Sequence, residues 1–178
     1  MSAIAVLSSN WIKDNHGETI MNIEKNDPTH SKGTLVFSSD HAGFEYKAFL
    51  KEKAQELGYI VIDCGTYSTE SVDYPDYIKP VVKEVLTGAK GVMICGSGIG
   101  MSMAANRFKG IRAALCFDGL MAQLAREHND ANILVLGERV IGKEEAASCL
   151  EAFLTASFQG GRHARRVEKM EAFSPACT

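Results

Sequence analysis

The chain has 178 residues, of which 46% are hydrophobic, and this is enough for one domain with a buried core. Its 19 basic and 22 acidic residues give a net charge of −3, which excludes the strongly basic surface of a typical nucleic-acid-binding protein or polybasic membrane anchor. The 5 cysteines form no CxxC motif, so neither a disulfide framework nor a zinc finger is predicted.

The N-terminal segment differs in composition from the rest of the chain. Residues 1–7 form a short apolar run that lacks the basic flank of a secretory signal and the length of a membrane span. Residues 8–32 are polar and have no sustained period. We therefore predict a poorly ordered extension over 1–32, a domain over 33–178 and a cytoplasmic protein. Two alternatives for the extension stay open, a targeting peptide and true initiation at Met21.

From Gly33 onward, short apolar runs alternate with amphipathic segments. Apolar runs predict strands, and apolar residues recurring every three or four positions predict helices. The predicted order is a strand at 35–37, a helix at 42–57, a strand at 59–62, a helix between Pro75 and Gly88, a strand at 92–95, a helix around 104–105, a strand at 111–117, a helix at 118–127, a strand at 133–136 and a last helix at 143–157.

The apolar runs show little alternation between apolar and polar residues, which is typical of strands that are buried on both faces. Strands that alternate with helices indicate βαβ units, whose right-handed crossovers place helices on both sides of one sheet. We therefore predict an α/β fold, a three-layer αβα sandwich around a mostly parallel, five-stranded Rossmann-like sheet.

Polar residues at three places in this pattern are candidates for a site, because ligands of open α/β sheets bind beyond the carboxyl ends of the strands. Asp40 and His41 follow the first strand, residues 95–100 follow the third, and His128 and Asn129 end the helix before the fifth. Each has a simpler alternative. Asp40 and His41 also fit a cap and a loop histidine, and His128 alone also fits a surface histidine.

The glycine loop at residues 96–100 is the most informative motif. Its glycines let the backbone approach a ligand, and the N–H groups of the following helix favour an anion. A dinucleotide-binding fingerprint would need a glycine at position 101, and a cysteine phosphatase would need an arginine there, so Met101 excludes both. A P-loop is excluded as well, because no Gly-Lys-Ser/Thr follows the glycines. Cys95 lies between a buried strand and this helix, where a thiol is readily deprotonated, with a small buried side chain as the alternative. The other cysteines fit buried positions or, for the last, an exposed tail: Cys64, Cys116, Cys149 and Cys177.

A basic cluster over residues 160–166 lies near the C-terminus. The forked guanidinium groups of Arg162 and Arg166 match phosphate oxygens, so a phosphate clamp is one interpretation of the cluster. A solvated helix start is the other.

Together these motifs resemble the ribose-5-phosphate isomerase B family, which is grouped with the bacterial galactose-6-phosphate isomerase subunits. The resemblance runs from about Thr34 to Phe173 and leaves out the N-terminal extension. The motifs occur in the order of the family: Asp40-His41-Ala42-Gly43, Asp63-Cys64-Gly65-Thr66, Asp73-Tyr74-Pro75, Cys95-Gly96-Ser97-Gly98-Ile99-Gly100, Ala104-Ala105-Asn106-Arg107, Gly110-Ile111-Arg112-Ala113, His128-Asn129-Asp130-Ala131-Asn132 and Gly160-Gly161-Arg162-His163.

This resemblance implies an aldose–ketose isomerisation between D-ribose 5-phosphate and D-ribulose 5-phosphate, a step of the non-oxidative pentose phosphate pathway, through an enediolate and without a metal ion or organic cofactor. Cys95 would move the proton between C2 and C1, with Glu70 in the second loop as the alternative base. Ser97 and the loop amides would hold the oxyanion. His128 would assist ring opening. The residues implied to contact substrate are Asp40, His41, Gly96, Gly98, Ile99, Gly100, Asn129, Arg139, Arg162 and Arg166, with Arg162 and Arg166 on the phosphate.

The resemblance also implies a homodimer with shared active sites, in which His128 and Asn129 face the partner's Cys95. A tetramer built as a dimer of dimers is the alternative assembly. Two rival functions stay open, an isomerase of six-carbon sugar phosphates and a non-catalytic module that binds phosphosugars. No nucleic-acid or membrane partner is predicted.

Overall fold

The computed structural model describes residues 11–13, 19–21 and 31–173. Near the N-terminus, β1 (Trp11–Lys13) and β2 (Thr19–Met21) form an antiparallel pair. The remainder of the predicted extension up to residue 30 lies outside the described residues, so its poor ordering stays a prediction. None of the helices in the described part of the chain has the length and apolar character needed to cross a bilayer.

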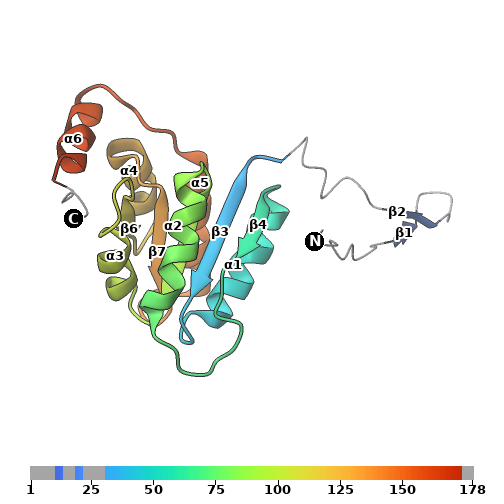
Figure 1. Cartoon of the computed structure of the whole chain (residues 1–178). Helices are drawn as coiled ribbons and strands as arrows, with labels where there is room; N and C mark the ends of the chain where they lie inside the picture. Colours follow the sequence, from blue (N-terminus) through green and yellow to red (C-terminus); the bar gives the residue numbers. More distant parts are fainter. Residues whose placement is uncertain (1–10, 14–18, 22–30, 174–178) are drawn as a thin grey trace, which may run out of the picture.

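A five-stranded sheet forms the centre of the domain (Figure 1). Its strands lie in the order β4-β3-β5-β7-β6, and each neighbouring pair is parallel. The strands are β3 (Thr34–Ser39), β4 (Ile60–Asp63), β5 (Lys90–Cys95), β6 (Ala113–Leu115) and β7 (Ile133–Gly137). The predicted α/β fold with a parallel five-stranded sheet is therefore confirmed.

Helices cover both faces of the sheet, because successive side chains of each strand point to opposite faces. Leu35 and Phe37 of β3 pack with one apolar cluster, whereas Val36 between them packs with the other. The first cluster is completed by α1 (Phe44–Glu56), α4 (Gly119–Asn129) and α5 (Lys143–Thr155). The second is completed by α2 (Ile78–Leu86) and α3 (Ile99–Ala105). Burial on both faces explains why the strands are apolar throughout.

Three local features differ from the sequence prediction. A 3-10 helix, η2 (Tyr74–Tyr77), precedes α2. The helix α6 (Arg162–Glu171) follows the one predicted as last, and it confirms the helix start that was one interpretation of the cluster at 160–166. Strand β6 is shorter than the predicted 111–117, and side chains satisfy the backbone N–H groups at its start. Asn132 Oδ1 accepts the N–H of Arg112 at 2.8 Å, and Asn106 Oδ1 accepts the N–H of Ala113 at 2.8 Å.

The sheet has a carboxyl edge, where its parallel strands end, and an amino edge, where they begin. The helix α3 starts at the carboxyl edge, directly after the loop that follows β5. The helix α6 lies at the amino edge, beside the end of α4 (Figure 1). The N–H of Gln159, in the segment leading to α6, donates to the carbonyl of Glu127 at 3.0 Å. These two edges carry the two groups of candidate residues.

Candidate active site

The loop after β5 folds back on the thiol of Cys95. Cys95 is 4% exposed, and its Sγ accepts the backbone N–H of Gly98 at 3.1 Å. Gly98 has φ +75°, a left-handed conformation that disfavours other residues, and a Cβ there would collide with Leu115. Ser97 Oγ accepts the N–H of Ile99 at 3.3 Å at the start of α3. The loop therefore bends back far enough for the N–H of Gly98 to contact the sulfur of Cys95.

The other described cysteines have less reactive surroundings. Burial raises the pKa of Cys116 and of Cys149 to about 12, so both stay protonated at neutral pH. Burial, followed by the charges of Asp63 and Glu84, also raises the pKa of Cys64. All four described cysteines are free thiols. These raised pKa values support the interpretation of Cys64, Cys116 and Cys149 as structural residues.

Asp40 and His41 lie at the same carboxyl edge as Cys95. Asp40 is 8% exposed, its Oδ1 accepts the N–H of Gly43 at 3.0 Å, and its own N–H donates to the carbonyl of Ile94 at 3.2 Å. His41 Nδ1 accepts the N–H of Val72 at 3.2 Å. A neutral His41 therefore carries its proton on Nε2, which leaves that nitrogen as a donor for a ligand.

Arg139 joins this group through the loop after β7. Its N–H donates to the carbonyl of Gly96 at 2.9 Å, and the N–H of Glu138 donates to the carbonyl of Cys95 at 3.0 Å. The guanidinium of Arg139 lies 3.4 Å from the position that a Cβ on Gly96 would take. The main chain therefore holds Arg139 next to the glycine loop.

Two residues at this edge were not predicted from the sequence. Lys47, 1% exposed, donates from Nζ to Asp63 Oδ1 and to the carbonyl of Thr66, both at 2.6 Å, and so anchors the second loop. The ring of Tyr74 lies so close to Gly100 that a Cβ there would be 2.6 Å from Tyr74 Cζ. Glu70, the alternative base, is exposed in this loop, and its N–H donates to Ser68 Oγ at 3.4 Å. The sequence signal available for Lys47 was a lysine at a buried position of a predicted helix.

His128, Asn129, Arg162 and Arg166 form the second group, and it lies at the amino edge. Grouping the end of α4 with the carboxyl ends of the strands, as the sequence suggested, is wrong for a single chain. The helix runs antiparallel to the strands, so its last turn lies where β7 begins. Ile133 at the start of β7 pairs with Gly91, whereas Gly137 at its end pairs with Cys95. The two edges are therefore separated by about 13 Å along the strands.

The second group is compact. The rings of His128 and His163 are stacked, with centroids 4.2 Å apart and an interplanar angle of 2°. Arg162 Nε donates to His163 Nε2 at 3.3 Å. Arg162 and Arg166 are exposed on α6, and Arg166 is close enough to influence the pKa of His163. Four of the predicted residues thus lie on two adjoining helices.

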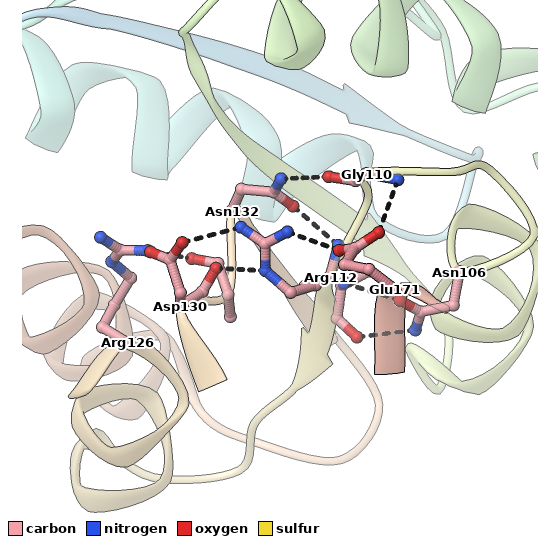
Figure 2. A network of polar contacts seen from close by, with 9 residues as sticks. Asn106, Gly110, Arg112, Arg126, Asp130, Asn132 and Glu171 are labelled. Carbon is pink, nitrogen blue, oxygen red and sulfur yellow. Dashed lines mark hydrogen bonds and ion pairs between the residues drawn. The ribbon is translucent and has the colours of Figure 1, made fainter. Parts of the chain in front are cut away.

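A polar network ties these two helices to the sheet (Figure 2). Arg112 donates from Nη2 to Asp130 Oδ2 at 2.8 Å and from Nη1 to Glu171 Oε1 at 2.7 Å. Asp130, with φ +47°, caps the end of α4 and also accepts from Arg126 at 2.9 Å. Glu171 Oε2 accepts the N–H of Gly110 at 3.2 Å, so the carboxylate of this residue anchors the last turn of α6.

Removing the side chain of Arg112 is expected to destabilise the domain. In Arg112→Ala, the carboxylates of Asp130 and Glu171 lose their shared partner, and we expect the free energy of unfolding to fall by about 2 kcal/mol, a value reduced for the partial exposure of these pairs. Urea unfolding measures the change. Lys53→Ala is the control, because Lys53 pairs with Glu56 on the surface of α1, and its unfolding midpoint should not move. Equal midpoints for both variants would contradict a structural role for the network.

A cavity of about 380 Å³ opens beside this network, between α4, β6, α6 and Asn106, the residue after α3. Its lining includes Asn129 together with Arg112, Glu171 and several alanines. The cavity therefore adjoins the second group of candidate residues rather than Cys95. Within the described part of the chain, no group of three or more His, Cys, Asp or Glu side chains is arranged to hold a metal ion.

Comparison with known proteins gives consistent matches. The family model described as Ribose/Galactose Isomerase matches residues 35–170. Ribose-5-phosphate isomerase B of Escherichia coli is 46% identical over 140 residues, which are 78% of this chain and 94% of the relative. The structure of ribose 5-phosphate isomerase B from Anaplasma phagocytophilum is 54% identical with a TM-score of 0.75, covering 79% of this chain and 97% of the other. That of ribose-5-phosphate isomerase B from Mycoplasma genitalium, with bound ribulose-5-phosphate, is 36% identical with a TM-score of 0.77, covering 81% and 97%.

Proposed function

The chain belongs to the ribose/galactose isomerase family, and from this membership we infer that it is an enzyme that interconverts D-ribose 5-phosphate and D-ribulose 5-phosphate. The main support for this function is the length of chain over which the sequence matches the family. It spans residues 35–170, almost the whole α/β domain, and relatives that match over this length are named ribose-5-phosphate isomerase B.

We propose that Cys95 is the base that moves the proton between C2 and C1 of the open-chain sugar phosphate. This step passes through an enediolate, whose negative oxygen needs hydrogen-bond donors placed in advance. Ser97 and the backbone N–H groups of residues 96–100 are our candidates for these donors. The loop after Cys95 supports this assignment, because it brings the N–H of Gly98 to the thiol and Ser97 Oγ to the start of α3.

Ring opening and phosphate binding need further groups, and our candidates for most of them lie at the amino edge. We propose that His128 transfers a proton at the ring oxygen, that Asn129 binds a sugar hydroxyl and that Arg162 and Arg166 bind the phosphate. The adjoining positions of these residues on α4 and α6 support a common role. Asp40, His41 and Arg139 would contact the substrate from the carboxyl edge.

A homodimer with shared active sites would bring the two groups together. Because the carboxyl and amino edges are separated within one chain, a two-fold axis has to place His128 of one protomer opposite the partner's Cys95. Exposed apolar side chains beside the glycine loop support an interface there. Ile99 is 53% exposed and Met103 is 62% exposed, both on α3.

The free thiols also fit the cytoplasmic location that we propose, since reducing compartments favour free cysteines.

A panel of sugar phosphates tests the proposed function. We expect the purified protein to isomerise D-ribose 5-phosphate with a kcat/KM at least about tenfold above that for D-allose 6-phosphate or D-galactose 6-phosphate, since a pocket sized for five carbons loses transition-state contacts with a longer chain. Product formation is followed by the absorbance of the ketose or by NMR. A preference for a six-carbon phosphate would reassign the substrate, and binding without turnover would indicate a non-catalytic module.

A further inference from the structure

The stacked pair of His128 and His163 contains a histidine to which the chemistry above gives no role. His163 is 6% exposed, whereas His128 is only half-buried. Their rings are almost parallel, 2° apart, with centroids 4.2 Å from each other. A flat ring packed at this distance restricts the orientation of its neighbour, because tilting His128 toward α6 would bring the two rings into collision.

Hydrogen bonding defines the protonation of His163. Its Nε2 accepts the Nε–H of Arg162 at 3.3 Å, so this nitrogen carries a lone pair and the proton of the ring is on Nδ1. A guanidinium only donates, so protonating Nε2 would break this contact and place a second cation beside Arg162. The ring of His163 is therefore held in its neutral form.

The charged groups around the two rings also favour the neutral form of His163. Burial, followed by His128 and then by Arg162 and Arg166, lowers the pKa of His163. The acidic residue of α4 is Glu127, whose carboxylate accepts hydrogen bonds from Gln123 and Gln159 at 2.8 and 2.9 Å. Two stacked imidazolium rings repel each other, so the pair holds one proton more readily than two.

We propose that His163 is a positioning residue, whose neutral ring stacks on His128 and orients that imidazole for proton transfer to the ring oxygen of the substrate. This proposal rests on the ring-opening role of His128. It assigns His163 to ring opening only, because its ring contacts His128 and Arg162, and neither contact joins it to a thiol. Loss of His163 should therefore slow ring opening and leave the enediolate step intact.

Two readouts separate these steps. Net isomerisation of D-ribose 5-phosphate requires ring opening, since this aldose is mostly a furanose. Exchange of the C1 proton of D-ribulose 5-phosphate with D2O requires only the enediolate step, since this ketose has its O5 phosphorylated and cannot close a furanose ring. NMR measures both rates on the same protein. We call the rate of this exchange divided by the kcat of net isomerisation the exchange ratio.

We expect His163→Ala to lower kcat from D-ribose 5-phosphate about tenfold and to raise the exchange ratio by a similar factor, less than the loss on removing the acid itself. His163→Phe retains a flat ring and is expected to restore kcat to within about threefold of wild type, although KM can rise because Arg162 loses its acceptor. This variant also keeps the test open where the alanine variant does not fold. An unchanged exchange ratio in the alanine variant, or no recovery of kcat with phenylalanine, would overturn the proposal.

His128→Ala distinguishes a failure of this proposal from a failure of the proposed function. A raised exchange ratio in His128→Ala with a normal ratio in His163→Ala would reject only the role of His163. A normal ratio in His128→Ala would reject the ring-opening role of His128, and with it the role of His163. Inactivity of the wild-type protein on D-ribose 5-phosphate would reject the function itself.

Discussion

Cys95→Ala is expected to lower kcat for D-ribose 5-phosphate by about 10³-fold or more while KM stays within about threefold, because the variant retains the binding groups and loses the proposed base. The substitution removes one sulfur atom from a buried site, and the N–H of Gly98, which donates to Sγ, loses that acceptor. The measurement is steady-state kinetics, with isothermal titration of an unreactive sugar-phosphate analogue to confirm binding.

Cys64→Ala is the matched control for this variant. Cys64 comes directly after the parallel strand β4, much as Cys95 ends β5, and it packs against the apolar cluster that contains Cys95. It has no glycine loop around it, and its thiol has a raised pKa. We expect its kcat to stay within about twofold of wild type. Normal turnover by Cys95→Ala would contradict the proposed mechanism and would favour Glu70 as the base.

Mixing two inactive variants is expected to restore activity if each site is shared between subunits. Cys95→Ala and His128→Ala homodimers should each have less than about 1% of wild-type kcat, since each lacks a proton-transfer group in both sites. A heterodimer of the two has one intact site and one site with both substitutions. Random reassortment of equal amounts makes half of the dimers mixed, so about one quarter of wild-type activity should return.

The control pairs two variants that act at the same edge. Cys95→Ala mixed with Asp40→Ala should recover almost nothing, because both residues lie at the carboxyl edge and no heterodimer contains an intact site. Differently tagged chains, co-expressed and purified by both tags, allow each heterodimer to be assayed alone. Equal behaviour of the two mixtures would show that each site is built within one chain.

Much of the fold could be predicted because burial acts on whole strands. A run such as residues 92–95 is apolar on both faces, since helices cover both faces of β5, and the same holds for residues 35–37 in β3. The glycine loop was equally visible, since a left-handed residue such as Gly98 and close contacts with neighbouring backbone restrict the side chains that fit. Both signals are local in the sequence, and the strands that the first one predicts are confirmed.

The features that were missed depend on contacts distant in the sequence. The helix α6 is rich in charged residues, and it is anchored through Glu171 to Arg112 rather than through a regular apolar stripe. Lys47 lies on the buried face of α1, but the partners that meet its ammonium group, Asp63 and Thr66, lie 16 and 19 residues further along the chain. The edge at which His128 lies was predictable, since a crossover helix between parallel strands must return to the amino edge.

The separation of the two groups of residues has a consequence for assembly in solution. In the proposed dimer, a sugar phosphate would touch both protomers at once, so substrate binding and subunit association become linked equilibria. Substrate would then hold the subunits together, and dilution would weaken the apparent affinity for substrate. Specific activity should accordingly fall on dilution below the dissociation constant of the dimer, and saturating substrate should shift that fall to lower protein concentrations.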